Sequence, residues 1–246
     1  MGKLDGKVAI ISGAAKPAGI GFAIAKCYVE EGAKVALCDI IEDLGKESAA
    51  SLGENAQFIR LDVTSEESWK AVFEKVVADW GKVDIVVNNA GVDHNDNAEE
   101  ITLEDFHRVC AINLDGVVLG QKYGIQYMKD HGGSIINAAS VGGLRALPTQ
   151  FSYTATKGAV RMLTKSAALH CCQNNYNIRV NTVLPGTIKT DMLLNCKEGP
   201  DFSAQFEPIG RVGEPYEVAG MYLYLASDDG AYCTVGEYLV DGGYAL

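Results

Sequence analysis

Short apolar segments alternate along the chain with longer segments of helical character. Apolar runs occur at residues 7–12 (KVAIIS), 34–39 (KVALCD), 57–62 (QFIRLD), 83–88 (VDIVVN), 134–138 (SIINA), 178–183 (IRVNTV) and 238–240 (YLV). Most are separated by stretches in which apolar residues recur at helical spacing. Strands that alternate with helices form parallel sheets, and strands covered on both faces are apolar throughout. The pattern predicts an α/β fold with a doubly wound, mainly parallel sheet of about seven strands and helices on both faces.

Local signals place the starts of several helices. Thr64 and Thr102 each lie three residues before an acidic residue, which is the spacing of an N-terminal capping pair. Pro215 lies in the first turn of a helix that runs to Ala226. Residues 187–213 lack a strong periodicity and contain glycines and prolines, so we expect a mobile excursion that covers an active site.

Composition and charge narrow the class of protein. The chain has 246 residues, of which 48% are hydrophobic. This length is enough for one domain over 1–246 with a large core that needs no disulfide or metal. A net charge of −11 without a dense basic run disfavours nucleic acid and anionic membranes as partners. No apolar stretch is long enough to span a membrane.

The cysteines indicate a reducing compartment. The chain start lacks the pattern of a signal peptide, and no metal-binding cysteine or histidine spacing occurs. We therefore expect a cytoplasmic protein with reduced thiols and no bound metal. The seven cysteines are Cys27, Cys38, Cys110, Cys171, Cys172, Cys196 and Cys233.

The first apolar run ends in a glycine-rich loop. Gly13, Gly19 and Gly21 lie where the strand turns into a helix, within SGAAKPAGIG. Such glycines serve a plain strand-to-helix turn, or they let the backbone approach a pyrophosphate at a helix N-terminus, as in a Rossmann fold. Asp39, at the end of the second run, favours the second interpretation, because a carboxylate there accepts hydrogen bonds from ribose hydroxyls. It also repels a 2′-phosphate and so predicts NAD over NADP, although Lys16 could attract that phosphate.

Small and polar residues follow the next two runs at the same edge of the predicted sheet. Asp62 and Val63 end the third run and are candidates to contact the adenine. The fourth run leads into Asn88-Asn89-Ala90-Gly91, where the backbone can pass close to a ligand.

Tyr153 and Lys157 are candidates for the chemistry. They lie four residues apart at the start of a predicted helix, so both side chains lie on one face. A nearby ammonium stabilises a phenolate and lowers its pKa toward the working range of a base. A chain with 11 tyrosines and 15 lysines is expected to contain roughly 0.7 such pairs by chance, so the neighbours matter. Ser140 follows the run SIINAA at the ligand edge, where its hydroxyl could polarise a carbonyl or simply cap a turn.

Together these residues resemble the short-chain dehydrogenase/reductase family over the whole chain. The resemblance rests on the glycine loop, Asp39, Asp62-Val63, Asn88-Asn89-Ala90-Gly91, Asn113 in INLDG, Ser140, Tyr153-x-x-x-Lys157, Pro185-Gly186 with Thr190, and Asp241-Gly242-Gly243. It implies a Rossmann-fold, NAD(P)-dependent oxidoreductase that interconverts a secondary alcohol and a ketone.

The resemblance also implies residue roles. Tyr153 would be the general acid/base and Ser140 would position the substrate oxygen. Lys157 would lower the pKa of Tyr153 and bind the nicotinamide ribose, and Asn113 would support a proton-relay water. The expected cofactor-binding residues are Gly13, Lys16, Gly19, Ile20, Asp39, Asp62, Val63, Asn89, Ala90, Gly91, Tyr153, Lys157, Pro185, Gly186, Ile188 and Thr190.

The glycine loop departs from the family pattern. Ala14 to Ala18 place more residues between Gly13 and Gly19 than the usual loop has. This longer loop resembles that of enoyl-acyl-carrier-protein reductases, which place the tyrosine and lysine farther apart and lack the serine. Ser140 with Tyr153-x-x-x-Lys157 therefore favours carbonyl/alcohol chemistry, while the longer loop leaves phosphate geometry and cofactor preference open.

The expected substrate pocket is largely apolar. Such a pocket suits a hydrophobic alcohol or ketone, although its methionine and leucines would equally serve packing. A hydroxysteroid or bile acid is one expected substrate, and a small secondary alcohol is the alternative. The candidate wall residues are Val141, Gly142, Gly143, Leu144, Gln150, Phe151, Met192, Leu193 and Leu194. Asp93, His94 and Asp96 look like metal ligands, but we interpret them as a solvated loop.

Two other functions are compatible with parts of the pattern. A non-catalytic dinucleotide-binding regulator would keep the glycine loop but need no Asn113, Ser140, Tyr153 and Lys157 set. An epimerase or dehydratase on nucleotide sugars would need a longer chain. The helical stretches at about 102–129 and 150–173 are long, and members of the resembled family pair such helices across two-fold axes, so we expect a homotetramer.

Overall fold

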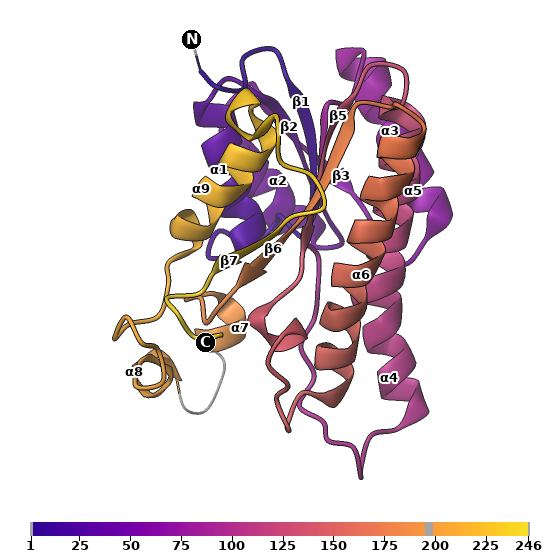
Figure 1. The fold of residues 1–246 in the computed structure, drawn as a ribbon. Coiled ribbons are helices and arrows are strands. Elements are labelled where there is room, and N and C mark those ends of the chain that lie inside the picture. Colours follow the sequence, from indigo (N-terminus) through magenta and orange to yellow (C-terminus); the bar gives the residue numbers. More distant parts are fainter. Residues whose placement is uncertain (1, 195–198, 246) are drawn as a thin grey trace.

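A parallel sheet forms the centre of the molecule. The structure is a computed structural model that describes residues 2–194 and 199–245. Its strands run in the order β3-β2-β1-β4-β5-β6-β7, and every neighbouring pair is parallel (Figure 1). The strands are β1 (Val8–Ser12), β2 (Lys34–Asp39), β3 (Ala56–Arg60), β4 (Ile85–Asn88), β5 (Gly133–Ala138), β6 (Ile178–Pro185) and β7 (Glu237–Val240). The predicted α/β fold is confirmed, and the strands agree with the predicted apolar runs to within a few residues at their ends.

Helices cover both faces of this sheet (Figure 1). One side carries α1 (Ile20–Glu30), α2 (Glu42–Ser51) and α9 (Pro215–Ala226), and the other side carries α3 (Glu66–Trp80), α4 (Leu103–Cys110), α5 (Gly116–Met128) and α6 (Phe151–Gln173). Shorter elements are the π-helical turn Ala111–Asp115, the 3-10 turns Val141–Gly143 and Asp228–Gly230, α7 (Asp191–Leu194) and α8 (Gly199–Ala204). None of the helices in the described part of the chain has the length and apolarity needed to cross a membrane.

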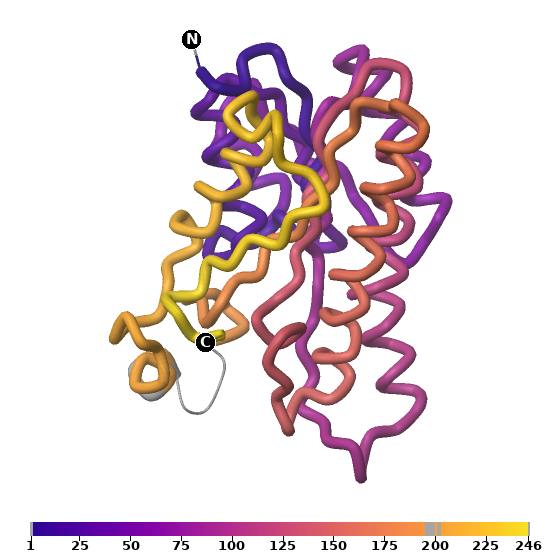
Figure 2. Tube along the Cα trace, in the orientation of Figure 1, coloured from indigo at the N-terminus to yellow at the C-terminus, as the bar shows by residue number. Residues whose placement is uncertain are grey.

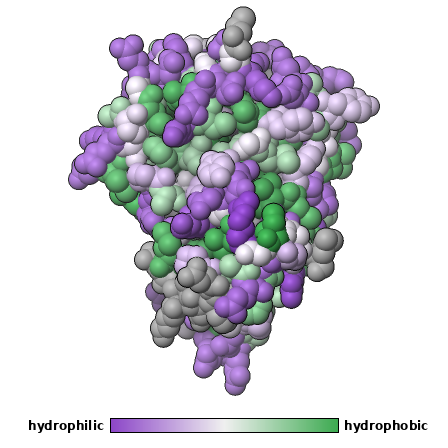
Figure 3. Space-filling model, turned by 90° about the vertical axis from the view of Figure 1, so that its left-hand side faces the viewer, coloured by the Kyte–Doolittle hydropathy of each residue, from purple (hydrophilic) through white to green (hydrophobic). Residues whose placement is uncertain are grey.

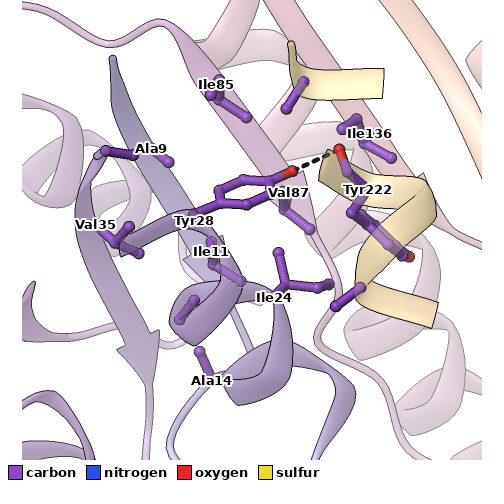
Figure 4. Packing of buried hydrophobic residues seen from close by; sticks show 14 of the residues in the cluster. Ala9, Ile11, Ala14, Ile24, Tyr28, Val35, Ile85, Val87, Ile136 and Tyr222 are labelled. Carbon is purple, nitrogen blue, oxygen red and sulfur yellow. Dashed lines mark hydrogen bonds between the residues drawn. The ribbon is translucent and has the colours of Figure 1, made fainter. Parts of the chain in front are cut away.

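Each face of the sheet has its own apolar core. On the side of α1 and α9, Tyr28 and Tyr222 lie fully buried among strand residues, and the Tyr28 hydroxyl donates to the Tyr222 backbone oxygen at 2.9 Å (Figure 4). This bond gives the buried Tyr28 hydroxyl the hydrogen-bond partner that it needs. It also ties the first helix to a helix late in the sequence. Trp69 and Phe73 of α3 fill the core on the other face.

The order of the strands reverses at the neighbours β1 and β4. From β1 the chain continues outward to β2 and β3 on one side, and from β4 it continues outward to β5, β6 and β7 on the other. In open α/β sheets the carboxyl ends of such a strand pair leave a crevice where ligands bind. The Ser12 hydroxyl accepts hydrogen bonds from the backbone N–H groups of Asn89 and Ala90 at 3.0 and 3.1 Å, so the two loops are fixed together. Gly13 has φ +68°, and a Cβ atom there would lie 2.7 Å from the Ala90 Cα. Only glycine fits at this approach.

Two helix starts test the capping predictions. Thr102 caps α4, because its hydroxyl oxygen accepts from the Asp105 N–H at 3.1 Å. The prediction for Thr64 is wrong, since Ser65 caps α3 and accepts from the Ser68 N–H at 3.1 Å. Thr64 instead donates its N–H and its hydroxyl to Asp62. The aspartate side chain thus forms a turn that moves the helix start by one residue.

The long helical stretch at 102–129 is present but not uniform. Its middle is the π-helical turn Ala111–Asp115, which joins α4 to α5 and contains Asn113. Single π turns inside α-helices frequently mark functional sites. The chain after β7 returns to the carboxyl edge of the sheet, since a Cβ atom at Gly186, which follows β6, would lie 2.7 Å from the Asp241 Cα. This segment is the yellow end of the trace in Figure 2.

Candidate active site

A cleft of about 760 Å³ lies at the carboxyl edge of the sheet. Its lining comes from loops that follow β1, β2, β3, β4, β5 and β6, together with α7 and Tyr244 near the C-terminus. Every residue predicted to bind the cofactor lines this cleft. The topology therefore brings these scattered residues to one surface.

The glycine loop leads directly into the N-terminus of α1. A Cβ atom at Gly21 would lie 2.3 Å from the Gly13 carbonyl oxygen, so the first helical turn packs directly on the end of β1. Gly19 precedes the helix, and no side chain caps its first N–H groups. The extra residues of this loop close into a turn in which the Gly19 N–H donates to the Lys16 oxygen at 2.8 Å. Uncapped N–H groups at a helix N-terminus suit an anionic group.

Asp39 lies at the end of β2 and faces the same cleft. Its carboxylate accepts from the Ala15 N–H at 3.1 Å and from the Ile41 N–H at 3.2 Å, which fixes its orientation. The Lys16 ammonium lies 3.6 Å from an Asp191 carboxylate oxygen, so it has an anionic partner within the chain. Asp62 lies farther along this end of the cleft, and hydrogen bonds from Thr64 lower the pKa of its carboxyl.

Ser140, Tyr153 and Lys157 come together at the other end of the cleft. The side chains of Ser140 and Tyr153 share a hydrogen bond, and Ser140 also accepts from the Gly142 N–H at 3.0 Å. The Lys157 ammonium donates to the Ala138 backbone oxygen at 2.9 Å and lies 5.5 Å from the centre of the Tyr153 ring. A hydroxyl pair with an adjacent ammonium can orient a carbonyl or carbinol oxygen and move a proton to or from it.

Burial dominates the ionisation of this group. It raises the pKa of Tyr153 to about 12, while the Ser140 hydrogen bond opposes the rise and the negative charge of Asp93 adds to it. Burial also lowers the pKa of Lys157 to about 8. The predicted lowering of the Tyr153 pKa by Lys157 is therefore not the net result in this arrangement, and the phenol is protonated at neutral pH.

Asn113 is buried and does not line the cleft. Its side chain accepts from the Val92 N–H at 2.8 Å and donates to the Val92 oxygen at 2.9 Å, which holds the loop after β4. It also donates to Thr156 on α6 at 3.3 Å. A Cβ atom at Gly91 would lie 3.3 Å from the Asn113 oxygen and 3.4 Å from the Lys157 nitrogen, so the three residues are neighbours.

The predicted substrate residues divide into two groups. Val141, Gln150, Met192 and Leu193 line the cleft. The expectation is wrong for the others, Gly142, Gly143, Leu144, Phe151 and Leu194, which do not line it. A Cβ atom at Gly142 would lie 3.4 Å from both the Ser140 hydroxyl and the Tyr153 ring, and Leu144 is exposed. Further lining residues that the sequence analysis missed include Ile40, Ile41, Asp93, Leu147, Thr187 and Tyr244. Of these, Asp93 could have been predicted from the sequence, because it lies two residues after Gly91, which was itself predicted to line the ligand site.

The interpretation of Asp93, His94 and Asp96 as a solvated loop is wrong for Asp96. This carboxylate is 8% exposed and accepts hydrogen bonds from Ser152 at the start of α6. Over the described residues, no group of three or more histidine, cysteine or acidic side chains is arranged to hold a metal ion. The six cysteines within those residues are free thiols, and Cys196 lies outside them.

One cleft at the switch point of the parallel sheet contains a glycine loop together with a serine, a tyrosine and a lysine. This combination is typical of a dinucleotide-dependent oxidoreductase. A family model described as "Enoyl-(Acyl carrier protein) reductase" matches residues 13–245. The chain belongs to the short-chain dehydrogenase/reductase family, as its motifs predicted. It is an NAD(P)-dependent oxidoreductase that acts on CH–OH donors.

Curated relatives match almost the entire chain. An NADP-dependent (R)-specific alcohol dehydrogenase of Lentilactobacillus kefiri is 42% identical and the match covers 98% of both chains. A 3-alpha-(or 20-beta)-hydroxysteroid dehydrogenase of Mycobacterium tuberculosis is 42% identical over 98% of this chain and 90% of its own. A 3-beta-hydroxysteroid dehydrogenase of Comamonas testosteroni is 39% identical over 97% of this chain and 96% of its own. These relatives support oxidoreduction between a secondary alcohol and a ketone.

Proposed function

We propose that Tyr153 is the general acid/base of this secondary alcohol dehydrogenase/ketone reductase. The observation that carries the proposal is the hydrogen bond between Tyr153 and Ser140 at the end of the cleft, with the Lys157 ammonium beside the phenol ring. In ketone reduction the Tyr153 hydroxyl donates its proton to the developing alkoxide. In alcohol oxidation the phenolate takes that proton, while the Ser140 hydroxyl holds the substrate oxygen.

The residues at the other end of the cleft fit a dinucleotide. The uncapped N-terminus of α1, reached over Gly13 and Gly21, suits a pyrophosphate, and Asp39 suits the adenine ribose. When bound, the nicotinamide supplies the hydride acceptor or donor of the reaction. Lys157 would bind the nicotinamide ribose, and the loop over Pro185, Gly186, Ile188 and Thr190 would hold the nicotinamide itself. Asn113 would act as a positioning residue that holds the loop at Val92, and it would support a proton-relay water.

We further propose that NAD is preferred over NADP. The Asp39 carboxylate is fixed at the end of β2, where it can accept hydrogen bonds from ribose hydroxyls and where a 2′-phosphate would meet its negative charge. The Lys16 ammonium is already paired with Asp191, which leaves less positive charge for that phosphate. The NADP dependence printed in the name of the Lentilactobacillus kefiri relative is a property of that protein.

The proposal predicts the outcome of one substrate and cofactor panel. Nicotinamide reduction is followed with NAD and NADP across secondary alcohols, from short alkanols to hydroxysteroids and bile acids. We expect turnover of secondary alcohols with kcat/KM at least about tenfold higher for NAD. The Asp39→Asn variant, which loses the charge and replaces one acceptor oxygen by an amide NH2 group, should shift the NAD/NADP ratio of kcat/KM toward NADP by about tenfold. The exposed Asp43→Asn on α2 is the matched control and should leave the ratio unchanged.

Two results would contradict this part of the proposal. A wild-type preference for NADP would remove the role of Asp39, as would an Asp39→Asn variant with the wild-type ratio. No turnover of any alcohol, with the cofactor still bound, would instead contradict the proposed substrate class. Met192 and Leu193 line the cleft beside other apolar residues, which supports a hydrophobic alcohol or ketone as substrate.

We also propose that residues 187–213 cover the substrate. The proposal is supported by α7, which places Met192 and Leu193 in the cleft lining, while residues 195–198 of this segment lie outside the described part of the chain.

We further propose that the protein is a homotetramer. This is supported by exposed large apolar side chains on α6, including Met162 and Leu169, and on α9, including Tyr216. Apolar side chains also gather among polar ones on the side of the molecule shown in Figure 3. The molar mass in solution is measured by light scattering. A molar mass that corresponds to a monomer would contradict the tetramer.

A further inference from the structure

A carboxylate lies at the substrate end of the cleft, where the sequence analysis expected apolar walls. Asp93 follows the loop after β4 and lines the cleft with Gln150 and Tyr153. Its oxygens accept from the His94 N–H at 2.8 Å and from the Gln150 side-chain amide at 2.6 Å. Gln150 immediately precedes α6 and lies three residues before Tyr153, so the Asp93 carboxylate and the Tyr153 side chain belong to the same part of the cleft.

A second carboxylate, Asp96, anchors the start of the helix that carries Tyr153. It accepts from the Ser152 N–H at 3.1 Å and from the Ser152 hydroxyl. The Asp96 backbone also pairs with Thr149, so the start of α6 is anchored twice by the same residue. The neighbouring carboxylate of Asp93 contacts this helix start through the Gln150 side chain and lines the cleft, where it can meet a ligand.

The surroundings of Asp93 leave it able to accept further hydrogen bonds. An ionised carboxylate accepts at about four positions, and two of them are used by His94 and Gln150. Among the described residues Asp93 forms no ion pair, and the two lysines in the described lining of the cleft have other partners, Asp191 for Lys16 and the Ala138 oxygen for Lys157. The rest of this end of the cleft includes the apolar side chains Leu147, Met192 and Leu193.

We propose that Asp93 and Gln150 form a polar subsite that selects alcohols with a second hydrogen-bond donor, a hydroxyl or an ammonium, on the carbon next to the carbinol carbon. The inference rests on the proposed function, because Tyr153 and Ser140 define where the reacting oxygen lies. A neighbouring donor then reaches the Asp93 carboxylate. An alcohol without that donor covers the carboxylate and leaves it without a partner, which costs binding energy in the transition state.

The test compares matched substrates with and without the second donor. The substrates are 2-butanol, 2,3-butanediol and 3-amino-2-butanol at pH 7, and the same ratio is measured for cyclohexanol and 1,2-cyclohexanediol. We expect kcat/KM of the wild-type enzyme to be at least about tenfold higher for the diols and the amino alcohol than for the corresponding simple alcohol. The exposed Asp130→Asn, which lies after α5, is the control and should keep these ratios.

Two variants separate the chemistry of the donor. Asp93→Leu has similar size and no acceptor, so it should abolish the preference for both donors and raise kcat/KM for the simple alcohols. Asp93→Asn keeps one acceptor oxygen but no charge. It should retain part of the preference for the diols and lose the preference for the amino alcohol, since an ammonium gains more from a charged acceptor.

Each remaining outcome has a definite meaning. Equal kcat/KM for simple alcohols and diols in the wild-type enzyme would overturn the subsite, and so would an Asp93→Leu variant with the wild-type ratios. A uniform loss for all substrates in Asp93→Leu, with an unchanged circular dichroism spectrum, would also overturn it, because Asp93 would then act through Tyr153 alone. No turnover of any alcohol by the wild-type enzyme would contradict the proposed function instead.

Discussion

Replacing Tyr153 by phenylalanine is expected to lower kcat/KM by about 10³-fold or more in both directions of the reaction, since a general acid/base contributes roughly 10²- to 10⁴-fold. The substitution removes only the hydroxyl that shares a hydrogen bond with Ser140, and it keeps the ring in the wall of the cleft. Cofactor affinity should therefore change little and stay within about threefold of wild type. A threefold change corresponds to less than 1.4 kcal/mol, the free energy of a tenfold change in affinity. Steady-state kinetics and quenching of protein fluorescence by the cofactor measure the two quantities.

The matched control is Tyr216→Phe on α9, because that side chain is exposed and lies outside the cleft. It should have wild-type activity. If Tyr153→Phe kept substantial turnover with an intact fold, another group would have to transfer the proton. If it lost cofactor binding to the same extent as activity, the residue would be part of the binding surface rather than the acid/base.

The second large effect is expected for Lys157→Met, which should lower the rate of alcohol oxidation at pH 7 by about 10²-fold or more. The lysine is buried, and burial lowers its pKa to about 8, so its charged form still dominates at pH 7. Removing this cation takes away the positive charge next to the Tyr153 ring, and the phenolate becomes harder to form. Methionine retains most of the side-chain volume, so the packing of α6 changes little.

The pH dependence follows from the direction of the Tyr153 shift. Burial raises the pKa of Tyr153 to about 12, so the base form needed for oxidation is scarce at neutral pH and increases as the pH rises. The acid form needed for reduction has the opposite dependence. Oxidation by the wild-type enzyme should therefore increase with pH and reduction should decrease. In Lys157→Met the oxidation profile should move to higher pH, because the phenolate has lost its neighbouring cation.

Lys165→Met is the control for this experiment. Lys165 lies two turns farther along α6 and pairs with Glu237 at 3.1 Å, away from the cleft. It should retain the wild-type pH profile. An unshifted profile in Lys157→Met would mean that Lys157 does not act on the phenol, and its role would then be limited to holding the cofactor.

Much of the fold was predictable because the strands are buried on both faces. A strand such as Val8–Ser12 is apolar throughout, and the glycine loop after it marks the turn to α1. The residues predicted for the cofactor lie on one cleft for the same reason, since the carboxyl ends of parallel strands must meet at one edge. The local sequence pattern was sufficient to predict the position of a residue wherever that position depends only on the end of the strand that it follows.

The rest depended on tertiary contacts that no local pattern shows. The start of α3 lies at Ser65 rather than Thr64, because Asp62 takes both donors of Thr64. Asn113 lies in a π-helical turn, and nothing in INLDG distinguishes that turn from an ordinary helix. The pKa of Tyr153 is raised rather than lowered, because burial of the phenol is the largest influence on it. Asp93 lines the cleft and bonds to Gln150, a residue that lies far from it in the sequence.

The central claim is that this cleft transfers hydride between a carbinol carbon and a nicotinamide while Tyr153 handles the proton. The most direct measurement uses a secondary alcohol that carries deuterium on its carbinol carbon, with NAD in ordinary water, and locates the label by mass spectrometry and NMR. The mechanism predicts one deuterium per turnover at C4 of the reduced nicotinamide, and none in the solvent. Label released to water, or product formed without label on the nicotinamide, would contradict it.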